Sequence, residues 1–142
     1  MLLLTLDTSE IHNPVGQPVV LVVEDEVLVR NFVCLQLQRE GYQVLAASDG
    51  VEALDLARAY TGSIQMLLTD VVMPRMDGLA LVERLLEERP GLRVLVMSGK
   101  LSSEAREQSI QLPFIKKPFL AKELREKIKE VMKNPPPPGK RP

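Results

Sequence analysis

Four short groups of polar residues each follow an apolar run, and their side chains are of types that do chemistry together. These groups supply acids, a hydroxyl and a lysine: Glu24, Asp25, Asp70, Ser98 and Lys117. Carboxylates crowded within about 4–6 Å of one another disfavour joint ionisation unless a cation lies among them. Their oxygens suit a hard ion with room for water, which favours Mg²⁺, with Mn²⁺ as a substitute. A metal and a lysine together suit an anion of high charge density such as a phosphoryl group.

Asp70 is the best-placed nucleophile of this set. It ends a central apolar run and precedes a loop that contains Pro74. A carboxylate can attack phosphorus and form an acyl phosphate. The residue types therefore indicate phosphoryl transfer to Asp70.

The elements that must position these residues alternate along the chain. Short apolar runs predict strands at 19–23, 42–46, 66–70, 93–97 and 114–115, and helical patterns follow at about 26–39, from 49, after the loop 71–77, at 102–111 and near 120–131. Five strand–helix repeats predict an α/β fold with a doubly wound parallel sheet. In such sheets the ligand site lies beyond the carboxyl ends of the strands, so the polar groups should converge.

Apolar spacing predicts the faces of two of these helices. Leu28, Phe32 and Leu35 lie on one side of the first helix. The last helix is marked by a repeat of four apolar positions, Leu120, Leu124, Ile128 and Val131. Its basic residues Lys122, Arg125 and Lys129 form a polar face, interpreted first as solvated and second as a docking surface.

Composition excludes several classes of protein. The 142 residues are 45% hydrophobic and 26% charged, with a net charge of −1, which argues against a general nucleic-acid binder. No apolar run approaches a membrane span, and residues 1–6 make a poor signal peptide. A single cysteine, Cys34, and a single histidine, His12, exclude a disulfide framework and a multi-histidine metal centre. We therefore expect a cytoplasmic protein.

The same patterns predict the organisation of the chain. Residues 1–18 are expected to be a flexible N-terminal segment, because 7–18 hold two prolines and no periodicity. Residues 19–133 form one domain. Residues 134–142, rich in proline, are expected to be a disordered tail that cannot continue a helix.

Four stretches, in order, resemble a known family. Val-Val-Glu-Asp-Glu (22–26), Leu-Thr-Asp-Val-Val-Met-Pro-Arg-Met-Asp-Gly (68–78), Val-Met-Ser-Gly (96–99) and Ile-Lys-Lys-Pro-Phe (115–119) look like a response-regulator receiver domain of the CheY-like superfamily. The resemblance covers roughly residues 18–133, and the last stretch is similar to receivers associated with hybrid sensor histidine kinases. It implies a flavodoxin-like fold with five helices and strand order 2-1-3-4-5.

The resemblance also implies roles for the acidic residues. Asp70 matches the phosphorylated aspartate. Asp25 matches the main metal-binding acid, and Asp70 and the backbone carbonyl of Val72 complete the protein ligands. Glu24, where the family often has aspartate, would reach Mg²⁺ through water.

Further roles follow for residues of the last two strands. Ser98 and Lys117 match the groups that contact the phosphoryl oxygens, and Phe114 matches an aromatic switch position. The bond before Pro118 resembles one that is cis in the family. Phe114 could equally be a core residue.

The function implied is two-component signal transduction. A sensor histidine kinase or a histidine phosphotransfer protein would donate the phosphoryl group, and the surface around 102–111, 114–115 and the last helix would change for an unknown downstream protein. No nucleic acid or membrane is expected as a partner, and self-association is left open. We expect no enzyme activity beyond self-catalysed phosphotransfer and autodephosphorylation.

Three rival interpretations remain at this point. A phosphorelay intermediate shares every site residue with a stand-alone signalling module. A protein-interaction domain that needs no phosphorylation is the second rival, although the complete set of site residues counts against it. The third, a phosphatase with an aspartyl-phosphate intermediate, commonly needs a second acid where this chain has Val72.

Overall fold

Five parallel strands form a single sheet in the order β2-β1-β3-β4-β5. The computed structural model describes residues 16–99 and 112–134. The strands are β1 (Val19–Val23), β2 (Gln43–Ala47), β3 (Met66–Asp70), β4 (Arg93–Ser98) and β5 (Phe114–Lys116). This confirms the predicted flavodoxin-like α/β class and its strand order.

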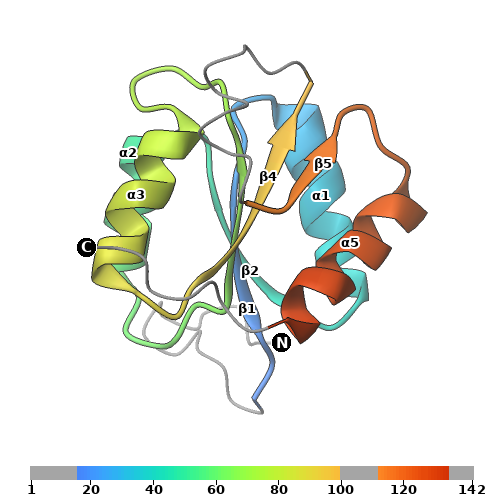
Figure 1. The fold of residues 1–142 in the computed structure, drawn as a ribbon, viewed down its shortest axis with the longest axis horizontal. Coiled ribbons are helices and arrows are strands. Elements are labelled where there is room, and N and C mark those ends of the chain that lie inside the picture. The colour runs from blue at the N-terminus through green and yellow to red at the C-terminus, as the bar shows by residue number, and fades with distance from the viewer. Residues whose placement is uncertain (1–15, 100–111, 135–142) are drawn as a thin grey trace, which may run out of the picture.

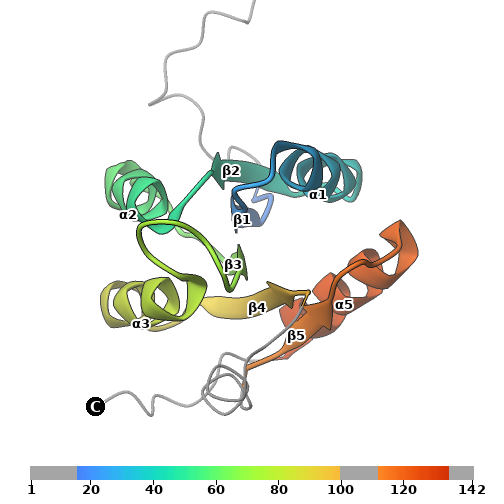
Figure 2. The ribbon, with the colours of Figure 1, turned by 90° about the horizontal axis from the view of Figure 1, so that it is seen from above.

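Helices cover both faces of the sheet (Figure 1). They are α1 (Val27–Arg39), α2 (Gly50–Ala59), α3 (Gly78–Glu88) and α5 (Ala121–Lys133). Seen from above, α2 and α3 lie on one side of the sheet, and α1 and α5 on the other (Figure 2). The helix predicted at 102–111, residues 1–15 with His12, and residues 135–142 of the proline-rich tail lie outside the described residues.

The two sides of the sheet give two apolar layers. Along β1, all five residues are fully buried, and their side chains alternate between the layers. One layer joins the sheet to α2 and α3, and the other joins it to α1 and α5. Cys34 and Met97 pack in the second layer, with Cys34 only partly buried. A strand buried on both faces is typical of a continuous apolar run such as residues 19–23.

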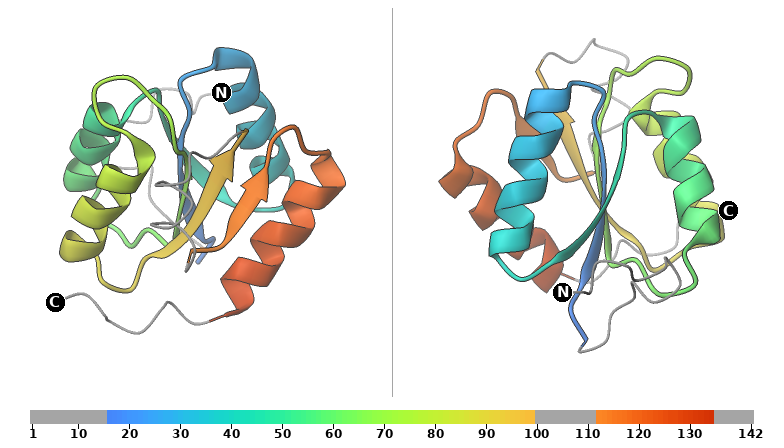
Figure 3. Two further views of the ribbon diagram at one scale, coloured as in Figure 1. Left: turned by 45° about the horizontal axis from the view of Figure 1, so that its top comes forward. Right: turned by 180° about the vertical axis from the view of Figure 1, so that it is seen from behind.

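The orientation of α1 was not evident from the sequence. The side formed by Leu28, Phe32 and Leu35 is exposed, with Leu28 at 82%, whereas Val33 and Leu37 are fully buried. Both sets of residues have helical spacing, so α1 carries two apolar stripes and the sheet covers only one. Figure 3 shows α1 packed along the same face of the sheet as α5.

The last helix, α5, also differs from expectation at its start. Leu124, Ile128 and Val131 are buried as predicted, but Leu120 precedes the first turn and is 68% exposed. The basic face is partly engaged within the molecule, because Arg125 and Lys129 each pair with Glu40 at the end of α1, at 3.7 and 3.6 Å.

No helix among the described residues is long and apolar enough to cross a bilayer.

Candidate functional site

The predicted polar groups meet at the carboxyl edge of the sheet. Thr69 of β3 lies opposite Val23, so Asp70 follows at the same level as Glu24. Asp70 is in register with Met97 of β4, and Ser98 with Lys116 of β5. Parallel strands end at one edge, so residues up to 93 positions apart along the chain are brought together here.

Asp70 is the last residue of β3 and is 8% exposed. Its Oδ1 accepts a hydrogen bond from the backbone N–H of Val71 at 2.8 Å, and its Oδ2 accepts one from Lys117 Nζ at 3.1 Å. Both carboxylate oxygens are therefore oriented at the carboxyl edge of the sheet.

Lys117 links two acids of the site. Its ammonium lies 2.8 Å from Glu24 Oε1 and 3.1 Å from Asp70 Oδ2. Glu24 is fully buried, and its Oε2 accepts a hydrogen bond from the backbone N–H of Glu26 at 3.0 Å. The lysine thus supplies the positive charge that allows neighbouring carboxylates to ionise together.

Burial and pairing act in opposite directions on these groups. Burial raises the pKa of Glu24, and nearby Asp70 adds to this, while Lys117 and the Glu26 N–H only partly offset it. Burial by itself lowers the pKa of Lys117, but the bonds to Glu24 and Asp70 outweigh it, so the pKa of Lys117 is raised. Lys117 is therefore held in its protonated, positively charged form.

The acidic residues form a set that could hold a metal ion. Ligand oxygens of Glu24, Asp25 and Asp70 all lie within 4.8 Å of one another, with Asp25 exposed. The donors are all carboxylate oxygens, the ligand type of hard divalent cations. Glu24 Oε1, although ion-paired, has no well-aligned hydrogen bond among the described residues. The donor set fits a hydrated Mg²⁺ ion.

Ser98 and Lys117 are held together by backbone. Ser98 ends β4, is buried, and its carbonyl accepts a hydrogen bond from the Lys117 N–H at 2.8 Å. The Lys117–Pro118 peptide bond is cis, the geometry that the resemblance implies. The hydroxyl of Ser98 and the ammonium of Lys117 therefore belong to one local unit at the edge of the sheet.

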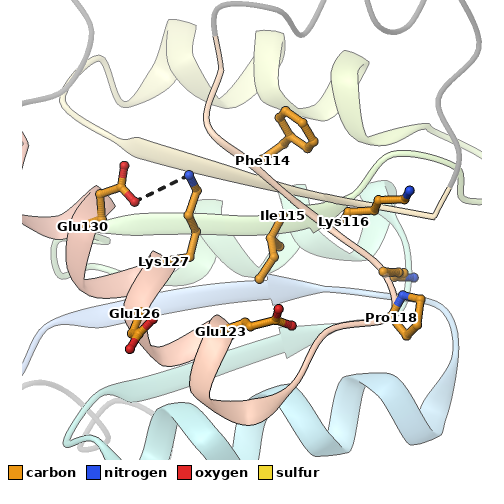
Figure 4. A pocket seen from close by; sticks show the side chains of 9 residues that line it. Phe114, Ile115, Lys116, Pro118, Glu123, Glu126, Lys127 and Glu130 are labelled. Carbon is orange, nitrogen blue, oxygen red and sulfur yellow. Dashed lines mark ion pairs between the residues drawn. The ribbon is translucent and has the colours of Figure 1, made fainter.

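Phe114 begins β5 and is 49% exposed, so it is not a core residue in this structure. It borders an open groove between β5 and α5, lined by strand lysines and helix glutamates (Figure 4). Across the groove, Lys127 and Glu130 of α5 pair at 3.5 Å. Lys117 also lines this groove, and so it belongs both to the groove and to the Asp70 site.

Two features of the loop after Asp70 were not evident from the sequence. At Gly78, an added Cβ would lie 1.9 Å from the carbonyl oxygen of Asp70, so only glycine fits there. Arg75, at the tip of the following loop, forms an ion pair with Asp49 at 2.6 Å. The Asp-Gly pair at 77–78 was a local signal for the first. The Arg75 contact has none, because it spans 26 positions.

Comparisons with known proteins agree on one family. The model of the response regulator receiver domain matches residues 20–129. The chain is 36% identical over 121 residues to the sensor kinase CckA of Brucella abortus, covering 82% of this chain but 13% of that protein. It is 32% identical over 127 residues to the chemotaxis protein CheY of Treponema pallidum, covering 86% and 88% of the two chains.

A solved structure gives the same answer. The CheY-like receiver domain protein of Methanospirillum hungatei superposes with a TM-score of 0.77 at 28% identity, covering 83% of this chain and 95% of that one. The fold, the acidic cluster with Lys117, and these relatives agree. The chain belongs to the response regulator receiver domain family and has the function of a two-component receiver.

Proposed function

We propose that this receiver accepts a phosphoryl group on Asp70 from the phosphohistidine of a sensor histidine kinase or a histidine phosphotransfer protein. The observation that carries the proposal is the Asp70 carboxylate, held by the Val71 N–H and by Lys117 beside two further acids. The proposal includes a cytoplasmic location, because the donor histidines are phosphorylated with nucleoside triphosphates, which are found in the cytoplasm.

The transfer requires little from the protein beyond position and charge. An oxygen of Asp70 attacks phosphorus, the phosphorus–nitrogen bond breaks, and the imidazole leaves with its electron pair and takes up a proton. Lys117 stays close to the acceptor oxygen and can follow the new phosphoryl oxygens. Ser98, one residue beyond Met97 in the adjacent strand, offers a hydroxyl donor on that side.

Mg²⁺ is the metal that we propose for the acidic cluster, held by Asp25, Asp70 and the Val72 carbonyl, with Glu24 through water. When bound, it supplies positive charge against the phosphoryl oxygens. We propose no enzyme activity on a separate substrate; the chain catalyses at most its own phosphorylation and dephosphorylation.

The output surface proposed is the one built from β5, α5 and the helix expected at 102–111. Lys117 supports this, because the same residue contacts Asp70 and lines the β5–α5 groove. A phosphoryl group that draws Lys117 away from Glu24 would alter the groove wall, and Phe114 stands at its rim. A downstream protein would then distinguish two populations of the receiver.

Exposed apolar side chains surround the acceptor and support a protein donor. They follow β1, β3 and β5 at the carboxyl edge, and are 55–82% exposed: Val27, Leu28, Val72 and Leu120. Apolar side chains grouped at a site rim mark contacts with another protein. A small phosphate donor would not need them.

The first experiment is intact-mass measurement after incubation with acetyl phosphate, with Mg²⁺ or with EDTA. Wild type should gain one phosphoryl group only with Mg²⁺, and Asp70→Asn should gain none. Asp77→Asn is the matched control, because Asp77 lies in the same loop and caps α3, a role that asparagine also fills. Phosphorylation of Asp70→Asn, or none of wild type, would overturn the proposal.

A second comparison tests the protein donor. Leu28→Ser should slow transfer from a phosphorylated histidine phosphotransfer protein while leaving phosphorylation by acetyl phosphate unchanged. Equal loss with both donors would place Leu28 in the fold and not in docking. Return of the phosphoryl group to a second histidine protein would identify a phosphorelay intermediate.

A further inference from the structure

The loop between β3 and α3 is closed at its base. The Gly78 N–H donates to the Val71 carbonyl at 2.7 Å, and the Val71 N–H donates to the Met97 carbonyl at 3.2 Å. Residues 72–77 therefore project from a fixed base formed by Val71 and Gly78, called the neck of the loop below. Seen from above, this segment swings over the start of α2 before it returns to α3 (Figure 2).

The tip of the loop is tied to α2 by one charged contact. Arg75 Nε and a terminal nitrogen donate to Asp49 Oδ2 at 3.0 and 2.6 Å. The other oxygen of Asp49 accepts from the Glu52 N–H at 2.8 Å and caps α2. Within residues 16–99 and 112–134, no other polar side-chain contact joins residues 72–76 to another element.

Arg75 adopts an unfavourable backbone conformation to make this contact. Its φ is +69°, in the left-handed region that glycine occupies without strain. Beside it, Gly50 allows a close approach, because a Cβ there would lie 2.8 Å from the Met76 Cβ. The start of α2 thus contacts two successive residues of the loop, Arg75 and Met76. The ion pair offsets the backbone strain at Arg75, which a glycine at that position would not have.

We propose that the Arg75–Asp49 pair is a latch that positions the loop so that the Val72 carbonyl faces the metal of the Asp70 site. The inference rests on the proposed function, since Val72 matters only if a metal binds there. Val72 lies three residues before Arg75 and directly beyond the fixed neck. Arg75 is a positioning residue in this account, because it acts through the loop.

The direction in which Arg75→Gln changes the Mg²⁺ affinity distinguishes the latch from a simple effect of charge. Arg75→Gln removes a positive charge near an acidic cluster, so charge alone predicts tighter Mg²⁺ binding. The latch predicts weaker binding, by roughly 10-fold, the low end of the range for residues that orient metal ligands. The measurement is a MgCl₂ titration followed by the amide NMR shifts of Val71 and Val72.

Arg58→Gln is the matched control. Arg58 pairs with Glu88 at 2.7 Å and also joins α2 to another element, but at the far end of the helix. Arg58→Gln should leave the Mg²⁺ affinity unchanged. Arg75→Lys should retain part of the wild-type Mg²⁺ affinity. Asp49→Asn, which keeps the helix cap, should lose as much Mg²⁺ affinity as Arg75→Gln. The double variant should bind Mg²⁺ no more weakly than either single variant.

Further readouts keep the inference distinct from the proposed function. In the acetyl phosphate reaction, Arg75→Gln should need more Mg²⁺ than wild type or Arg58→Gln to reach half of its own maximal rate, because its metal affinity is lower. Mg²⁺ binding as tight as or tighter than wild type overturns the latch, and so does a wild type that binds no Mg²⁺. A wild type that binds Mg²⁺ but never gains a phosphoryl group overturns the proposed function alone.

Discussion

Lys117 is the residue on which the charge balance of the site depends. Glu24 is fully buried and has this ammonium at 2.8 Å, while Asp70 shares it at 3.1 Å. Removing one partner of a buried ion pair leaves an uncompensated charge, which is more destabilising than the pair was stabilising. The lysine therefore supports the fold, in addition to the phosphoryl contact that we propose for it.

Lys117→Ala should lower the free energy of unfolding by about 1–3 kcal/mol in EDTA at mildly alkaline pH, where the acids are ionised and would be left without their partner. The variant should still bind Mg²⁺, and the ion should restore part of the loss. Urea denaturation with and without Mg²⁺ measures both effects. Lys116→Ala, the exposed neighbour on β5, is the control. Equal stability of Lys117→Ala and wild type would mean that Glu24 is not charged in the folded protein.

At the scale of elements, α1 shows how packing selects among equivalent patterns. Its two apolar stripes have the same spacing, yet only the one with Val33 and Leu37 contacts the sheet. We expect Leu37→Ala to lower the unfolding free energy by about 2–5 kcal/mol. Leu28→Ala should change it by less than about 0.5 kcal/mol. The two variants make the same substitution on one helix, so their denaturant midpoints show which stripe is inward. A larger loss of stability in Leu28→Ala than in Leu37→Ala would reject this orientation of α1.

The start of α2 should respond to acid. The backbone N–H of Glu52, and then the Arg75 guanidinium, lower the pKa of Asp49 below its ordinary value of 3.8. Because the folded-state pKa is below the unfolded one, the stabilisation is present above about pH 4 and is lost as pH falls through the folded-state pKa.

Asp49→Asn keeps a capping side chain but cannot ionise, so its stability deficit relative to wild type should be present near pH 6 and shrink in acid. Urea unfolding over this range checks it, with Asp55→Asn at an exposed site of the same helix as control. A deficit that grows as the pH falls would contradict the assigned cause.

For the whole molecule, a metal ion bound at the acidic cluster would link the site to global stability. A ligand that binds only the folded state raises the unfolding free energy by about 2.7 kcal/mol at 100 times its dissociation constant. Mg²⁺ should therefore raise the thermal midpoint and EDTA should reverse the rise. Asp25→Ala should lose most of the Mg²⁺ response, and a full response in that variant would remove Asp25 from the metal site.

Much of the architecture could be predicted from local patterns. The strands at 19–23 and 66–70 are found as predicted, because continuous apolar runs of that length are buried in a parallel sheet from either side. The strand expected at 42–46 is shifted by one residue, to Gln43–Ala47, since it lies at the edge of the sheet and is only half-buried.

The residues that end each strand can be identified from local sequence patterns, and they define which side chains the parallel sheet brings to one edge. Strand ends are local features, and a parallel sheet aligns them without further information. Three features depend on how the chain packs in three dimensions: the contact of Lys117 with both Glu24 and Asp70, the stripe of α1 that is inward, and the contact of Arg75 with Asp49. Those contacts join segments distant in the chain, and their partners are chosen by packing geometry, which no local spacing encodes.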